Sequence, residues 1–260
     1  MLSVIKLFLT SNNTDIQHAM LPQLMCELYS LLNEEYTLEL EKCDTKPFCI
    51  RLFEKDNEWC WSVTCFGRKA YENIILPLTD RKFSSFVLPG SNDMRISITR
   101  KNVFKQSVDS LIEESVLGKS PYRFTLQFIA PTVFKNNDRF VFFPDIYLMY
   151  ESLLDRSQLV SDKISFADKE TFEELVRATS ITAYDIKTSR CILDHERTTG
   201  FIGRVTFRID GPELMRGYAK MLFRLGEFTG IGEGGTQGLG AIFLEKEEGR
   251  HGQYTEKNNS

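Results

Sequence analysis

Glycines are concentrated near the C-terminus in a segment that could hold an anion. Residues 229–240 read TGIGEGGTQGLG, and this segment contains Gly230, Gly232, Gly234, Gly235, Gly238 and Gly240. A helical repeat of leucines precedes it and the apolar run 239–244 follows it, so the loop is expected to join a helix to a strand. Nucleotide-binding glycine loops run from strand to helix, and the P-loop lysine is absent here. Two interpretations stay open: a nest of backbone N–H groups for a phosphate, and a tight turn packed against the last strand.

Histidine and cysteine are the other residue types whose chemistry is informative. The three histidines, His18, His195 and His251, are widely separated, and the six cysteines include no Cys-x-x-Cys pair. We therefore expect no metal site, no cofactor, and reduced thiols in a cytoplasmic protein. His251 lies in a polar tail and His195 lies beside acidic residues at an expected hairpin tip. His18 stands where a helix is expected to begin.

Composition and charge limit the class of protein. The chain has 260 residues, of which 42% are hydrophobic and 26% charged, and its net charge is −4. No apolar run approaches the roughly 20 residues that a membrane span needs. The negative total argues mildly against nucleic acid, but the segment 177–224 carries nine cations and five acids. Arg190, Arg197 and Arg204 are our candidates for phosphate contacts, and an ordinary solvated surface is the alternative.

The pattern of apolar residues predicts an α+β protein with two similar halves. In the first half we expect strands over 2–9, 48–53, 59–66, 83–88 and 94–99, and helices over 20–32 and 71–78. In the second we expect a strand over 122–130, a helix from Pro144, two long strands around Thr198–Gly200, a helix over 213–226 and a last strand over 239–244. Each half reads β-α-β-β-α-β, the ferredoxin-like (RRM-like) unit. We expect an N-terminal domain at 1–115, a linker at 113–120, and a C-terminal domain with the glycine-rich loop at 121–248.

Five motifs in order give the chain a resemblance to a known family. They are Lys46-Pro-Phe48 with the strand after it, the segment 124–135 (FTLQFIAPTVFK), Pro144-Asp145 with the following helix, Gly200-Phe-Ile-Gly203, and the glycine-rich loop. Together they resemble the CRISPR-associated repeat-processing endoribonucleases, the Cas6 family. The resemblance implies tandem ferredoxin-like domains, binding of CRISPR repeat RNA, and one metal-independent cut that releases crRNA. Other CRISPR effector subunits are further expected partners, and a membrane is not.

Such a cut needs proton transfer and stabilisation of negative charge on phosphorus. The 2′-OH of the RNA attacks the adjacent phosphate, and histidine is suited to moving the protons at neutral pH. His18 is our candidate, because family members often have a histidine at this place. Lys42, Lys46 and Arg51 are the candidates for phosphate charge. For His18 and for each of these cations, a surface residue without a role is the alternative.

The chain departs from the family pattern at one point that bears on activity. Many relatives have a second histidine shortly before the Pro-Phe motif, whereas residues 36–43 here read YTLELEKC. A non-catalytic subunit that holds crRNA in an effector complex is therefore the second hypothesis. A metabolic enzyme on the same fold is disfavoured, because no cofactor loop or acid–base cluster is visible.

Overall fold

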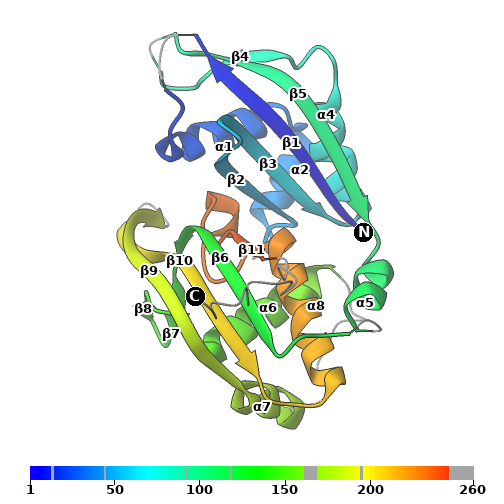
Figure 1. The fold of residues 1–260 in the computed structure, drawn as a ribbon. Coiled ribbons are helices and arrows are strands. Elements are labelled where there is room, and N and C mark those ends of the chain that lie inside the picture. Colours follow the sequence, from blue (N-terminus) through cyan, green and yellow to red (C-terminus); the bar gives the residue numbers. More distant parts are fainter. Residues whose placement is uncertain are drawn as a thin grey trace, which may run out of the picture.

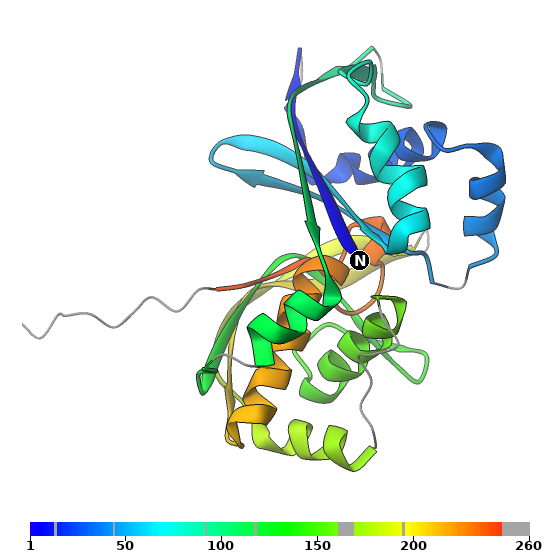
Figure 2. The same cartoon turned by 90° about the vertical axis from the view of Figure 1, so that its right-hand side faces the viewer.

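Each half of the chain forms an antiparallel sheet with helices packed on one face (Figures 1 and 2). This computed structural model describes residues 1–12, 15–43, 45–91, 93–116, 119–160, 169–193 and 196–245. The strand orders are β2-β3-β1-β5-β4 and β11-β6-β10-β9, while β7 and β8 form a separate pair. In both large sheets the first strand of the half lies centrally, between the third and the last strand of a β-α-β-β-α-β unit. The predicted tandem ferredoxin-like fold is confirmed.

The first half contains the elements β1 (Leu2–Ser11), η1 (His18–Met20), α1 (Leu21–Ser30), α2 (Glu34–Glu41), β2 (Phe48–Lys55), β3 (Glu58–Phe66), α3 (Gly67–Ala70), η2 (Tyr71–Ile75), α4 (Leu76–Thr79), β4 (Ser85–Val87) and β5 (Arg95–Gln106). Helix α5 (Val108–Val116) follows. The second half contains β6 (Arg123–Thr132), β7 (Phe134–Asn136), β8 (Arg139–Val141), α6 (Ile146–Val160), α7 (Lys169–Ala178), β9 (Thr179–Leu193), β10 (Glu196–Ile209), α8 (Glu213–Thr229), η3 (Gly235–Gln237) and β11 (Ile242–Leu244).

Alternation along β1 gives the first sheet two chemically different faces. Leu7 and Leu9 are buried in the first hydrophobic core together with Leu24 of α1. Lys6 and Phe8 alternate with these leucines along the strand, so their side chains point to the opposite face of the sheet. That face carries no helix of its own and is turned toward the second half.

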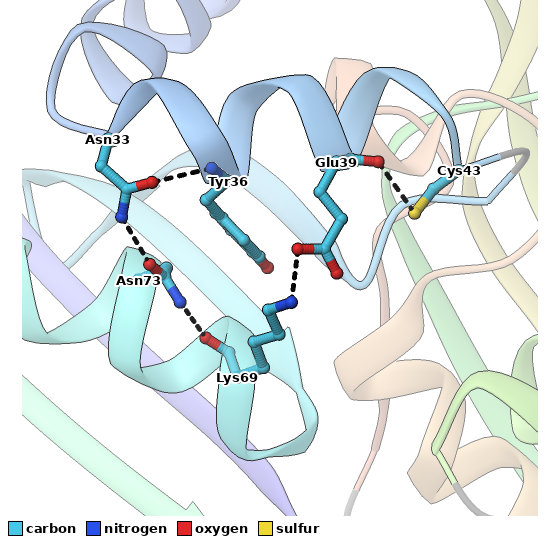
Figure 3. Close-up of polar contacts among 6 residues, drawn as sticks. All are labelled: Asn33, Tyr36, Glu39, Cys43, Lys69 and Asn73. Atoms are coloured by element: carbon cyan, nitrogen blue, oxygen red, sulfur yellow. Dashed lines mark hydrogen bonds and ion pairs between the residues drawn. The ribbon is translucent and has the colours of Figure 1, made fainter.

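Helix α2 is fixed to the helical segment 67–79 by polar contacts (Figure 3). The Asn33 Oδ1 caps the helix by accepting from the Tyr36 N–H at 2.7 Å, and its Nδ2 donates to Asn73 Oδ1 at 2.8 Å. Lys69 forms an ion pair with Glu39 one turn further along. These contacts hold α2, and the C-terminal end from which the chain leaves it, on the helix-bearing side of the first half.

The structure corrects several details of the sequence-based elements. Thr198–Gly200 lies within β10 and is not a turn; β9 ends at Leu193 and β10 begins at Glu196. Helix α6 begins at Ile146 rather than Pro144, and the last strand is only Ile242–Leu244. Helices α2 and α7 were not predicted, and α5 covers the first part of the expected linker. Within the described residues, no helix is long and apolar enough to cross a membrane.

The C-terminal end of α8 joins the two halves. The Arg51 side chain of β2 is buried and donates to the carbonyl oxygens of Glu227 and Gly226, the latter at 3.4 Å. Two residues earlier on the same face of β2, the Cys49 thiol donates to the Thr229 carbonyl at 3.0 Å. Carbonyls in the last turn of a helix lack partners within the helix and carry negative partial charge. The cation of the first half therefore satisfies acceptors of the second half.

A second arginine completes this junction from within the second half. Arg156 of α6 donates to the Thr229 carbonyl at 2.8 Å and also to the Gly232 carbonyl. Burial lowers the pKa of the Arg51 guanidinium, while nearby Cys49 and Glu227 act in the opposite direction. We call Arg51, Arg156 and the carbonyls that they bind the α8 clamp. We propose that the two domains are residues 1–115 and 121–248, and that the α8 clamp joins them. Residues 246–248 lie outside the described part of the chain.

Removing the buried cation should destabilise the whole protein. We expect Arg51→Ala to lower the free energy of unfolding by about 2–4 kcal/mol, because the carbonyls that it binds would be buried without partners. The exposed Arg81, changed to Ala, should cost less than about 0.5 kcal/mol. Denaturant unfolding followed by circular dichroism measures both, and equal stabilities of the two variants would contradict the role of the clamp.

Candidate functional site

A groove runs between the helix-free faces of the two sheets. Its volume is about 700 Å³. It is lined by the first half through Lys6, His18, Phe53 and Glu54, and by the second half through Gln127, Phe128, Ile129, Lys187, Ile202, Gly203, Phe243 and Glu245. The groove therefore exists only when both halves are folded and held together.

The end of the groove next to the sheet junction is closed by a small apolar cluster. Phe8, Phe53 and Cys60 of the first sheet are buried against Ile129 and Phe243 of the second. The rings of Phe53 and Phe243 lie edge to face with centroids 5.9 Å apart. These contacts fix the distance between the two walls of the groove.

His18 is exposed at the rim of the groove, and one aromatic ring orients it. It begins the 3-10 turn η1, which leads directly into α1. Its imidazole lies edge to face on the indole of Trp59 in β3, with centroids 5.1 Å apart and an interplanar angle of 74°. The ring is thus held at the groove mouth while its nitrogens stay accessible to a ligand.

Two lysines on opposite walls give the groove positive charge. Lys6 projects from the middle of β1, and Lys187 projects from β9 opposite Ile202. Among the described residues, neither lysine forms an ion pair. Of the two lining carboxylates, Glu245 pairs with Arg204 at 2.5 Å. A phosphate in the groove would therefore meet two ammonium groups and an imidazole, together with the carboxylate of Glu54, which forms no ion pair with a described residue.

The structure does not bring Lys42 and Lys46 to His18. His18 contacts Trp59, which pairs with Glu54 at the far end of β2. Lys46 precedes the other end of that strand, where the Phe66 N–H donates to the Pro47 carbonyl. Seven residues of extended chain separate these ends, or about 20 Å. Lys42, the C-cap of α2, lies on the helix-bearing side, so His18, Lys42 and Lys46 do not form one site.

The glycine-rich loop does not offer the predicted nest of free N–H groups. The N–H of Gly232 donates to Ser152 Oγ at 2.7 Å, and that of Glu233 donates to the Val133 carbonyl at 2.8 Å. The N–H groups of Gly230 and Gly238 also donate to backbone carbonyls, at 2.8 and 3.4 Å. The geometry agrees instead with the alternative of a tight turn, in which η3 packs against β2 and α1.

Charge near the loop also disfavours a phosphate. A hollow of about 220 Å³ beside Gly232 is lined by three carboxylates, those of Glu151, Asp155 and Glu233. Of the two lining cations, Arg156 is already bound to carbonyls of the clamp. Gly234 and Gly235 face side chains within the protein: a Cβ on Gly234 would lie 2.8 Å from Leu239. These contacts favour packing as the role of the loop, and phosphate binding by its glycines stays a prediction.

The predicted arginine stripe is divided between the two faces of the second sheet. Phe201 of β10 points into the helix-side core. Arg197 and Thr199 lie an even number of residues from Phe201, so they share its face of β10. Arg190 of β9 pairs with Thr199 and therefore lies on the same face. Both arginines are thus on the helix side, at the hairpin end of β9 and β10. Arg204 has the opposite parity and lies on the groove side, where it binds Glu245. Only Arg204 is therefore placed next to the groove.

Sequence reasoning missed the two groove lysines. Lys6 is the single charged residue in the apolar run LSVIKLFL, and such a lone cation on an alternating strand signals a face away from the core. Lys187 lay within the basic segment but was not singled out. His195 and His251 lie outside the described residues. Among those that are described, no group of three or more His, Cys, Asp or Glu could hold a metal ion.

Comparisons with known proteins agree on one family. The model of the CRISPR-associated endoribonuclease Cas6 family matches residues 126–242. A CRISPR-associated endoribonuclease Cas6 of Streptococcus thermophilus is 25% identical over 220 residues, which are 84% of this chain and 88% of that protein. The Cas6 of Mycobacterium tuberculosis (strain H37Rv) is 23% identical over 225 residues, which are 86% of this chain and 71% of that protein.

Solved structures show the same fold. The product complex of Cas6 (TTHB231) of Thermus thermophilus has a TM-score of 0.75 and 19% identity, and the match covers 94% of this chain and 100% of that one. A substrate mimic complex of Cas6 (TTHA0078) has a TM-score of 0.71 at 19% identity, with 94% and 99% covered. A chain of a partial Cas6-RT-Cas1–Cas2 complex has a TM-score of 0.59 at 15% identity, with 98% of this chain and 47% of that one covered.

The packing role of the glycine loop can be tested by adding side chains. Gly232 has φ +71° and Gly238 has φ +83°; a Cβ at Gly238 would lie 2.5 Å from Leu21, and one at Gly232 would meet the Val133 carbonyl. We expect Gly232→Asp and Gly238→Asp each to lower the free energy of unfolding by at least ~2 kcal/mol, because the positive φ and the clash both cost energy. Folded variants of wild-type stability that bind RNA less tightly would instead restore the phosphate nest.

Proposed function

We propose that the chain is a member of the CRISPR-associated endoribonuclease Cas6 family, and that it binds the repeat RNA of a CRISPR transcript and cuts it to release mature crRNA. The groove carries this proposal. Between two RRM-like sheets it carries an exposed imidazole and two ammonium groups that form no ion pair with any residue that the structure describes. The tight clamp and the apolar cluster hold both walls in place, as a site that must position RNA requires.

Recognition in the groove combines charge with apolar surface. Lys6 and Lys187 attract the phosphodiester backbone, and the contact should weaken as salt rises. Phe243 and Ile202 offer partly exposed apolar surface on which a base or ribose can pack. Arg190 and Arg197 remain proposed contacts to RNA that lies outside the groove. A net charge of −4 is compatible with RNA binding, because the cations that contact the RNA are gathered in the groove.

We propose that the cut follows the internal route of RNA. The 2′-oxygen attacks the neighbouring phosphorus, and the bond from phosphorus to the 5′-oxygen breaks. The 2′-OH gives up its proton to His18 or to solvent. The 5′-oxygen that leaves gains a proton. The products are a 2′,3′-cyclic phosphate and a 5′-OH. His18 moves a proton, and Lys6 and Lys187 stabilise the charge on the phosphorane. This chemistry needs no metal ion.

The partners and the compartment follow from the same assignment. The related structures include a product complex, a substrate mimic complex and an assembly with Cas1 and Cas2, so repeat RNA, crRNA and other CRISPR subunits are the proposed partners of this chain. The cytoplasm is the proposed compartment. All six cysteines have free thiols, which suits a reducing environment.

Removal of the imidazole should separate cutting from binding. We expect His18→Ala to slow cleavage of the cognate repeat by about 10²-fold or more, the usual contribution of a proton-transfer residue, with RNA affinity nearly unchanged. Cleavage by the wild type should persist in excess EDTA. Single-turnover kinetics on end-labelled repeat RNA measure the rates, and mass spectrometry of the fragments identifies their ends.

Lys42→Ala and Lys46→Ala are the matched controls, because both lysines lie far from the groove. They should cut at the wild-type rate. If Lys46→Ala loses activity while His18→Ala keeps it, the catalytic centre lies at the connection between α2 and β2 and the groove only binds RNA. A wild type that binds its cognate repeat and never cuts it would favour the non-catalytic crRNA-binding subunit.

A further inference from the structure

Another hollow on the molecule, next to the groove, is lined by more cations than carboxylates. It has a volume of about 360 Å³ and lies where the chain passes from α5 into β6, beside α8. Its charged lining residues are Lys119, Arg123, Lys220 and Arg224 on the basic side and Glu114 and Glu245 on the acidic side. We call it the basic pocket. None of its residues belongs to the predicted site.

The positive charge of the basic pocket is not used within the described structure. Lys119, Arg123 and Lys220 form no ion pair with any described residue. Arg224 binds Glu227 at 2.9 Å, and the lining Glu245 is taken up by Arg204 from outside the pocket. Three cations thus remain available to an anionic ligand. A phosphate is the group that such a cluster suits.

The walls of the basic pocket are rigid. Helix α5 packs tightly on α8, since a Cβ at Gly217 would lie 3.2 Å from the Val116 Cα. The Arg216 Nε donates to the Ser120 carbonyl at 3.1 Å, which ties the segment after α5 to α8. The cations on these elements are therefore held near one another before a ligand arrives, which lowers the entropic cost of binding.

The basic pocket and the groove are adjacent. Glu245 lines both hollows. Along β6, Gln127 lines the groove and Arg123 lines the basic pocket, and both share the parity of the groove-side face. Arg123 and Gln127 are four residues apart, which is about 13 Å along the strand. An extended RNA strand that leaves the groove along β6 reaches the basic pocket directly.

We propose that the basic pocket binds a backbone phosphate of the repeat RNA at a distance from the cut, as a second anchoring site for the strand that leaves the groove. The inference rests on the proposed function, because it takes the ligand of the groove to be RNA. It assigns Lys119, Arg123 and Lys220 to affinity and not to chemistry. The strand is then held at two places, so the register of the cut depends on both.

The test compares two charge reversals of equal size. The first variant is Lys119→Glu with Lys220→Glu, and its matched control is Arg81→Glu with Lys82→Glu on the exposed surface before β4. Fluorescence anisotropy gives the Kd of each for the complete repeat RNA, with His18→Ala in all chains, over a range of salt. We expect the first variant to bind about tenfold or more weakly than its control. Its salt slope should be smaller by about 0.7, the value for one lost single-strand phosphate contact.

Shortened RNAs and cleavage rates make the result specific. We expect RNAs trimmed stepwise from each end to lose, at some length, the phosphate that the basic pocket binds. At that length the variant and its control should have equal Kd values, although the RNA still contains the cut site. At saturating RNA, in chains with His18 intact, the variant should cut at the control rate. Equal Kd values on the complete repeat, or a deficit that persists on every shortened RNA, would overturn the inference.

The outcomes separate this inference from the function on which it rests. If the control protein does not bind repeat RNA at all, the proposed function fails. If it binds and cuts while the basic-pocket variant behaves identically, only the second anchoring site fails. Lys119→Gln with Lys220→Gln repeats the comparison without added negative charge; a loss smaller than that of the Glu variant supports the phosphate contact, and no loss contradicts it.

Discussion

The arrangement of the two halves depends on the carbonyl groups at the C-terminal end of α8. Helix ends leave such acceptors without partners, and here two arginines satisfy them, the buried Arg51 of the first half and the partly buried Arg156 of the second. Arg51 matters more for the junction, because it extends from β2 of the first half to the carbonyls of α8 in the second half. Without that contact, the Cys49 thiol would be the remaining polar link between the open face of the first sheet and the last turn of α8 among the described residues. The glycine-rich loop continues from the same helix end, and the amides of Gly230, Gly232 and Gly238 are bound within the protein.

The groove is a consequence of this junction. The clamp and the cluster of Phe8, Phe53 and Phe243 fix one end of the contact between the sheets, and the faces then diverge. Strand alternation decides what lines the gap. Lys6 and Lys187 occupy groove-side positions on strands whose other face is core, so the fold itself presents these cations to a ligand. Strand alternation also puts Arg123 on the groove-side face of β6, where it lines the basic pocket.

Much of the fold could be read from the sequence, because β1, β2, β3 and α1 carry clean apolar periodicity. The site was harder, since its residues meet through pairings across the chain. His18 lies on Trp59, 41 positions away, and the loop amides find Val133 and Ser152. The segments that were missed, α2 and α7, are short and largely polar. The division of Arg197 from Arg204 follows from their odd spacing on one strand, once Phe201 is known to face the core.

On the proposed function, repeat RNA is cut in the groove between the two sheets. A photoreactive uridine beside the mapped cut, in an RNA made uncleavable by a 2′-deoxy substitution at that place, tests it most directly. After irradiation, mass spectrometry of the digested protein locates the adduct. Adducts are expected on the segments that carry Lys6, His18 or Lys187, which line the groove. Adducts confined to the connection between α2 and β2, with none in the groove, would contradict it.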